Sequence, residues 1–150
     1  NAGLSPAGKR LDLAQVAVNE AVKACGPIRF VTLDGRVPQS TVATMLNAAD
    51  CLLLTSDWEG SPTIVQEALA CNLPVVSVDV GDVRERLAGV VPSRIVERNP
   101  RALGKELAEM LARPVRSNGC AWTAPIAQDY IVGKTVDLYR AVLGPERAAC

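Results

Sequence analysis

The sequence predicts a three-layer α/β domain, Rossmann-like, around a parallel sheet, and three observations support this prediction. Segments with helical spacing of apolar residues alternate along the chain with short, continuous apolar runs such as Cys51 to Thr55. Continuous apolar runs are typical of strands that a parallel sheet buries on both faces. With 150 residues, 49% of them hydrophobic, the chain is long enough to bury a sizeable core. We therefore expect residues 1–150 to form a single domain.

The elements follow from apolar spacing and from start and stop residues. Gly26-Pro27 ends a first helix, Ser40 can cap a second, and Asn99-Pro100 is a strong helix start before the stop at Pro114. The expected helices lie at 11–25, 40–49, 62–71, 82–87, 100–113 and about 131–142. The expected strands lie at 28–33, 51–55, 75–78 and 95–96.

Composition excludes several classes of function. Sixteen basic and sixteen acidic residues cancel, so net charge gives no reason to expect binding to nucleic acid or to an anionic membrane. The chain has no histidine, and its five cysteines show no C-x-x-C spacing, so we expect no metal site and reduced thiols in a cytoplasmic protein. No apolar run approaches the roughly 20 residues that span a bilayer.

Three loops follow the expected strands, at 34–37, 56–61 and 79–82. The carboxyl ends of parallel strands meet at one edge of the sheet, where such folds bind ligands. The middle loop runs directly into a helix start, where Ser61 can cap the helix and Pro62 suits its first position. This edge is therefore the expected ligand site.

Two carboxylates, Glu59 and Glu67, flank that helix start. Pro62 places Glu59 in the loop and Glu67 about one and a half turns inside the helix, so the two do not share a helical face. The unpaired amides of residues 63–65 and the helix dipole form an anion site. A diphosphate at the helix start, a ribose beside Glu67 and a sugar beside Glu59 fit this layout. A solvated charge is the simpler interpretation of either glutamate taken alone.

The run from Leu46 to Glu85, LNAADCLLLTSDWEGSPTIVQEALACNLPVVSVDVGDVRE, closely resembles the C-terminal, donor-binding domain of group 1 (family 4) glycosyltransferases of the GT-B fold. Weaker similarity extends from Lys9 to Tyr139. The resemblance implies that the parent enzyme transfers a sugar from a nucleotide-diphosphate sugar, with retention and without a metal or other cofactor, in bacterial polysaccharide or glycoconjugate biosynthesis. The acceptor, whether sugar, lipid or protein, stays open.

The resemblance also assigns roles to single positions. It implies catalytic roles for Glu59, near the donor sugar, and for Lys9, which would neutralise the donor phosphates. The positions implied for donor binding are Glu67 at the ribose, Gly60, Ser61 and Gly81 near the sugar, the amides of Thr63 and Ile64 at the diphosphate, and Gly35 and Val37 at the base.

The chain departs from the family pattern in several places. Gly3 stands where an arginine is common, Pro62 where glycine is common, and Asp82 where a second glycine is common. We also expect a fragment, because a first central strand and the N-terminal acceptor domain of the family are absent. Alone, such a fragment should not catalyse transfer, and any membrane contact would come through the absent domain.

Two other hypotheses stay open: a non-catalytic nucleotide-binding or regulatory module, and a GT-B-like sugar-nucleotide epimerase. Some side chains have simpler interpretations than a site. Trp58 is expected to pack locally, and the final helix with Trp122 resembles the segment that crosses back to the other domain of the family. The basic stretch is expected to be a solvated face; it comprises Arg94, Arg98, Arg101 and Lys105.

Overall fold

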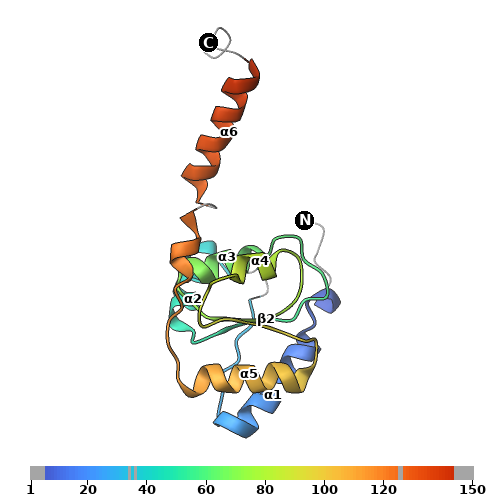
Figure 1. Cartoon of the computed structure of the whole chain (residues 1–150). Helices are drawn as coiled ribbons and strands as arrows, with labels where there is room; N and C mark the ends of the chain where they lie inside the picture. The colour runs from blue at the N-terminus through green and yellow to red at the C-terminus, as the bar shows by residue number, and fades with distance from the viewer. Residues whose placement is uncertain (1–5, 34, 36, 125–126, 144–150) are drawn as a thin grey trace.

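The computed structural model of the chain describes residues 6–33, 35, 37–124 and 127–143 (Figure 1). Its three strands, β1 (Leu52–Leu54), β2 (Val75–Val78) and β3 (Arg94–Val96), form one parallel sheet in the order β1-β2-β3. Leu53 lies opposite Val76 in one pair, and Ser77 lies opposite Ile95 in the other. The predicted parallel α/β fold is confirmed.

Helices cover both faces of this sheet (Figure 1). On one side lie α1 (Leu11–Cys25) and α5 (Pro100–Ala112), which pack against each other. On the other lie α2 (Gln39–Ala48), α3 (Thr63–Ala70) and α4 (Val83–Leu87). Two short 3-10 helices, η1 (Pro6–Lys9) and η2 (Gly119–Trp122), complete the domain. The three predicted layers are therefore present.

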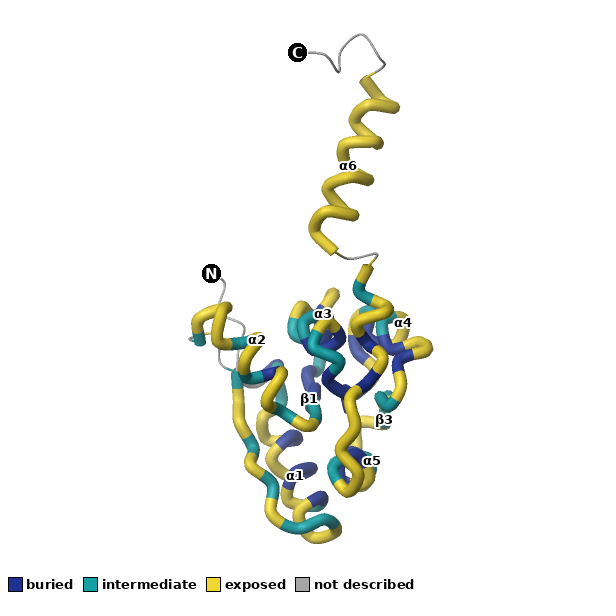
Figure 2. Tube along the Cα trace, turned by 90° about the vertical axis from the view of Figure 1, so that its left-hand side faces the viewer, coloured by how far each residue is buried: buried dark blue, intermediate teal, exposed yellow. Residues whose placement is uncertain are grey.

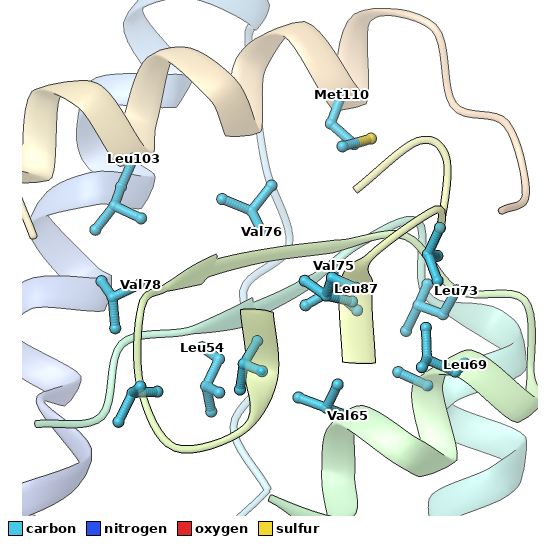
Figure 3. Packing of buried hydrophobic residues seen from close by; sticks show 14 of the residues in the cluster. Leu54, Val65, Leu69, Leu73, Val75, Val76, Val78, Leu87, Leu103 and Met110 are labelled. Atoms are coloured by element: carbon cyan, nitrogen blue, oxygen red, sulfur yellow. The ribbon is translucent and has the colours of Figure 1, made fainter. Parts of the chain in front are cut away.

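Aliphatic side chains from both helical layers meet at β2, all of whose residues are buried. Figure 3 shows Val76 pointing toward Leu103 and Met110 of α5, whereas Val75 lies on the opposite side with Val65 of α3. Because both faces of the strand are covered, its apolar run is continuous rather than alternating.

The packing of α1 against α5 depends on one glycine. A Cβ added at Gly104 would lie 2.6 Å from the Cβ of Glu20 and 2.8 Å from the carbonyl oxygen of Ala17. The two helix backbones therefore approach each other too closely for any larger residue.

Helix ends match the sequence in part. The side chain of Asn99 accepts hydrogen bonds from the amides of Arg101 (2.9 Å) and Ala102 (3.3 Å), so the predicted cap of α5 is confirmed. The predicted cap at Ser40 is wrong. Helix α2 begins at Gln39, and the carbonyl of Pro38 accepts from the amides of the first turn instead.

The predicted strand at 28–33 is also wrong. The segment forms no strand, because no described strand pairs with its backbone. Ile28 and Phe30 instead pack against a second apolar cluster between α1 and α5, which contains Val18 and Leu107. Apolar character is thus explained by contact with helices rather than by a place in the sheet.

The last helix, α6 (Gln128–Leu143), extends away from the domain (Figure 1). None of its residues is buried, and Figure 2 shows it exposed along its whole length. The prediction of a final helix is confirmed. Trp122, just before it, is half exposed and lies over Gly89. Among the helices that the structure describes, none has the length and apolar composition needed to cross a membrane.

Candidate functional site

The loops that follow β1 and β2 contact each other backbone to backbone. The amide of Asp82 donates to the carbonyl of Gly60 at 3.0 Å. Gly81 has a φ of 55°, and a Cβ at this position would lie 2.3 Å from the Gly60 oxygen and 2.8 Å from the Glu59 oxygen. Only glycine fits such a close approach in the left-handed region. The two loops therefore share one edge of the sheet, as the sequence predicts.

Helix α3 begins beside these loops with two amides that donate to no described partner. Pro62 precedes the first helical residue, Thr63, and no side chain caps the helix. The amide of Val65 donates to the carbonyl of Pro62 at 3.0 Å, but those of Thr63 and Ile64 make no hydrogen bond within the described residues. They lie at the positive end of the helix dipole, where an anion is favoured.

Ser61 does not cap α3, which corrects the sequence interpretation. Its hydroxyl accepts from Nε2 of Gln66 at 2.8 Å and from Nη2 of Arg86 at 2.9 Å. Arg86 also donates to Oδ2 of Asp82 at 2.8 Å. Because the side chain of Ser61 is used in this way, the amides at the start of α3 stay open to another acceptor.

Lys9 and Glu59, fifty residues apart, form an ion pair at this edge. Nζ of Lys9 lies 2.6 Å from Oε1 of Glu59, and the two side chains are 40% and 11% exposed. Removal of Lys9 would leave a poorly hydrated carboxylate without its ion-pair partner, which is unfavourable. The structure thus brings together the two residues for which the resemblance implies catalytic roles.

Glu67 has a neutral partner. Its Oε1 accepts from Nε2 of Gln39 at 2.5 Å. Gln39 stands two positions after Val37, so this contact brings the loop of Gly35 and Val37 to Glu67. Gly35 has a φ of 80° and open space around it. Sequence reasoning missed Gln39, although its place directly after this loop is a usable signal.

The segment from η1 to Arg10, which contains Lys9, is anchored to residues just after β1. The amide of Asp57 donates to the carbonyl of Gly8 at 2.9 Å, and Oγ1 of Thr55 donates to the carbonyl of Lys9 at 3.1 Å. The indole of Trp58 lies over Gly8, where a Cβ would be 2.7 Å from the ring. Trp58 is nevertheless 65% exposed, and Gly8 lies fifty positions earlier in the chain, so packing of Trp58 within its own loop stays a prediction.

Arg98 is exposed, as the prediction of a solvated basic face expects, but it also makes specific hydrogen bonds that the prediction did not include. Its Nη1 donates to the carbonyls of Thr55 (3.0 Å) and Ser56 (2.9 Å) and to Oδ1 of Asp57 (3.0 Å). The other members of the stretch, Arg94, Arg101 and Lys105, are also exposed, and none of them has a described contact with the end of β1. Sequence reasoning missed Arg98, and the residues around it carry no signal that distinguishes it.

Asp82 and Pro62, two of the positions at which the chain departs from the family pattern, lie within the described residues. Asp82, in place of a second glycine, pairs with Arg86 through one oxygen, whereas its Oδ1 is buried without a partner among the described residues. Pro62 lies just before α3 and so does not interrupt it. Gly3 lies outside the described residues. No group of three or more histidine, cysteine, aspartate or glutamate residues is placed for metal binding in the part of the chain that the structure describes.

A parallel sheet between two helical layers, with a helix start and charged loops at the carboxyl ends of its strands, defines a Rossmann-like α/β domain. A family model described as "Glycosyl transferases group 1" matches residues 16–121. Because the match covers most of the chain, the chain belongs to this family, and its fold is that of a Rossmann-like half of a GT-B enzyme.

Two curated proteins are similar to parts of the chain. "Putative teichuronic acid biosynthesis glycosyltransferase TuaC" of Bacillus subtilis (strain 168) is 51% identical over 49 residues, which are 33% of this chain and 13% of that protein. "2-deoxystreptamine N-acetyl-D-glucosaminyltransferase" of Streptomyces fradiae is 32% identical over 81 residues, 54% of this chain and 19% of that protein. The chain thus spans less than a fifth of either relative. No solved structure matches it.

Proposed function

We propose that this chain is the donor-binding part of a glycosyltransferase that moves a sugar from a nucleoside diphosphate sugar to an acceptor, with retention of configuration. The observation that supports it most directly is the ion pair of Lys9 and Glu59 at the same sheet edge as the open amides of α3. A cation and free N–H groups can bind a diphosphate, and a carboxylate beside them can accept from sugar hydroxyls.

In this proposal positive charge stabilises the leaving group. Negative charge develops on the departing diphosphate in the transition state, and preorganised donors at that point lower the barrier. The amides of Thr63 and Ile64 and the ammonium of Lys9 are such donors. Glu59 accepts from a hydroxyl of the sugar, near Gly60, Ser61 and Gly81. The proposal requires no divalent metal.

The nucleoside would lie further along α3. Glu67 accepts from the ribose hydroxyls, and the backbone of Gly35 and Val37 faces the base. Gln39 supports this assignment, because it fixes Glu67 beside the loop that would meet the base. The acceptor would bind a separate N-terminal domain in the cytoplasm. Polysaccharide or glycoconjugate biosynthesis is the proposed context, supported by the name of the Bacillus relative.

Calorimetry tests the ribose assignment. ADP, GDP, UDP and dTDP would be titrated into the wild-type chain and into Glu67→Ala. A hydrogen bond to a charged group contributes about 1.5–3 kcal/mol, so Glu67→Ala should weaken the preferred nucleotide about tenfold or more. Glu109→Ala, which removes an exposed carboxylate of α5, is the control. Equal affinities of the two variants would refute the role of Glu67.

A screen of nucleotide sugars against the full-length protein tests transfer itself. The proposal expects turnover of one donor, in the presence of a chelator as well as in its absence, with loss of turnover in Glu59→Gln. Nucleotide binding without transfer to any acceptor would favour the non-catalytic module instead. Conversion of the donor to a sugar epimer would favour the epimerase.

A further inference from the structure

Lys9 is the last residue of η1, and the segment from η1 to Arg10, called here the Lys9 loop, is attached to the rest of the domain through charged side chains from three segments. Asp57 comes just after β1, Arg98 just before α5, and Arg10 directly after Lys9. We propose that Arg98 is a positioning residue for Lys9 and acts through Asp57. The inference rests on the proposed role of Lys9 as the cation that binds the donor diphosphate.

The first step joins Arg98 to the end of β1. A single nitrogen, Nη1, lies within 3.0 Å of the carbonyl oxygens of Thr55 and Ser56 and of Oδ1 of Asp57. Thr55 and Ser56 are buried, and buried carbonyls need a donor. Arg98 is therefore the residue that sets the direction in which the chain leaves β1.

The second step joins the same residues to the Lys9 loop. The amide of Asp57 donates to the carbonyl of Gly8 at 2.9 Å. Oδ1 of the Asp57 side chain accepts from Nη1 of Arg10 at 3.2 Å. Oγ1 of Thr55 lies 3.1 Å from the carbonyls of both Lys9 and Arg10. The residues before and after Lys9 are thus both fixed by the segment that Arg98 orients.

The third step concerns the backbone after Lys9. Arg10 has a φ of 52°, in the left-handed region that is unfavourable for a residue with a side chain. Its guanidinium is bound by Asp12 and Asp57, which raise its pKa further above the ordinary value. Asp12 makes most of the hydrogen bonds to this guanidinium, and Asp57 joins it to the end of β1, so in our proposal loss of Asp57 releases Arg10 from β1 and allows its backbone to relax. The ammonium of Lys9 then leaves its place beside Glu59.

Because the Asp57 and Arg98 side chains are about one third exposed, their attraction is screened by water. Arg98 should therefore affect the geometry of the loop more than the stability of the domain. Arg94, only four residues away, is a suitable control. It pairs with Glu106 at 3.4 Å and has no hydrogen bond or ion pair to residues 6–10 within the described part of the chain.

The test compares nucleoside diphosphates with nucleosides. ADP, GDP, UDP and dTDP and their four nucleosides would be titrated into the wild type, Lys9→Ala, Arg98→Ala and the double variant, with Arg94→Ala as the control. The diphosphate gain is the ratio of the affinity for a nucleoside diphosphate to the affinity for its nucleoside. This ratio should fall about tenfold in Lys9→Ala and in Arg98→Ala, with nucleoside affinity unchanged. The double variant should lose no more than Lys9→Ala alone, because both changes act on one interaction. Arg94→Ala should match the wild type.

The outcomes separate the two proposals. A Lys9→Ala variant that keeps the full diphosphate gain, or a wild type without any gain, overturns the proposed role of Lys9 and this inference with it. Loss in Lys9→Ala but not in Arg98→Ala overturns the positioning role alone, as does a double variant whose losses add. If Arg98→Ala does not fold, Asp57→Asn replaces it, since it keeps the shape of the side chain. The same tenfold loss is expected there, and an unchanged gain overturns the inference.

Discussion

Substitution of Gly81 by alanine should disturb the site and the stability of the domain together. The φ of 55° at Gly81 costs a non-glycine residue about 1–2 kcal/mol. The added Cβ would also lie 2.3 Å from the carbonyl oxygen of Gly60, closer than real Cβ atoms come to other heavy atoms. Overpacking of this kind costs roughly 1–3 kcal/mol. We therefore expect Gly81→Ala to lower the free energy of unfolding by about 2–5 kcal/mol.

Gly26→Ala separates the two contributions. Gly26 has a φ of 89° and a ψ of −164°, a conformation that is nearly restricted to glycine, but a Cβ there would meet nothing within 4 Å. Urea denaturation should therefore show only the backbone cost of about 1–3 kcal/mol for this variant. Nucleoside diphosphate binding should weaken in Gly81→Ala, because Glu59 and Gly60 must shift, and stay unchanged in Gly26→Ala. Equal losses of stability, or unchanged binding in Gly81→Ala, would refute the argument from close approach.

Three further predictions concern stability and thiol chemistry. Gly104→Ala should lower the free energy of unfolding by about 1–3 kcal/mol in urea, because α1 must move away from α5, whereas Gly133→Ala on α6, with open space around it, should not destabilise. Asn99→Ala should cost about 1 kcal/mol in the same assay through loss of the α5 cap, and no change would contradict the capping role. At pH 8, iodoacetamide should label exposed Cys120 well before Cys51, as mass spectrometry would show. Burial raises the pKa of Cys51 from 9.0 to about 12, so in the folded chain its thiol stays protonated, and the difference should shrink in urea.

The helices could be predicted because their signals are local. Gly26 ends α1 and Asn99 caps α5 through contacts with residues only a few positions away. A strand depends on a neighbour that is distant in sequence. Val75–Val78 is a strand because β1 and β3 pair with it on both sides, whereas residues 28–33, four of which are apolar, have no such partner among the described residues. Apolar pattern alone does not distinguish these two cases.

The site was predictable where one segment contains it. The loop that contains Glu59 leads directly into the start of α3 at Thr63. Their proximity in space therefore follows from their proximity in the sequence. Contacts between distant surface side chains were not predictable in this way. Arg98 and Asp57 are 41 residues apart, and Gln39 and Glu67 are 28 apart. In the sequence, Arg98 does not differ from its exposed neighbour Arg101, because only the fold shows which of them reaches the end of β1.

The different partners of the two glutamates suggest different tasks. Glu67 accepts from a neutral amide, but Glu59 is only 11% exposed and depends on the ammonium of Lys9, 2.6 Å away. A diphosphate at the start of α3 would compete for that ammonium and leave Glu59 poorly hydrated, unless a sugar hydroxyl donates to it. A nucleotide sugar supplies both groups, and a nucleoside diphosphate supplies only one. Calorimetry of Glu59→Gln should therefore show stronger binding of the nucleoside diphosphate and a smaller preference for the sugar nucleotide. If Glu59→Gln kept the same preference for the sugar nucleotide over the nucleoside diphosphate, Glu59 would not contact the donor sugar.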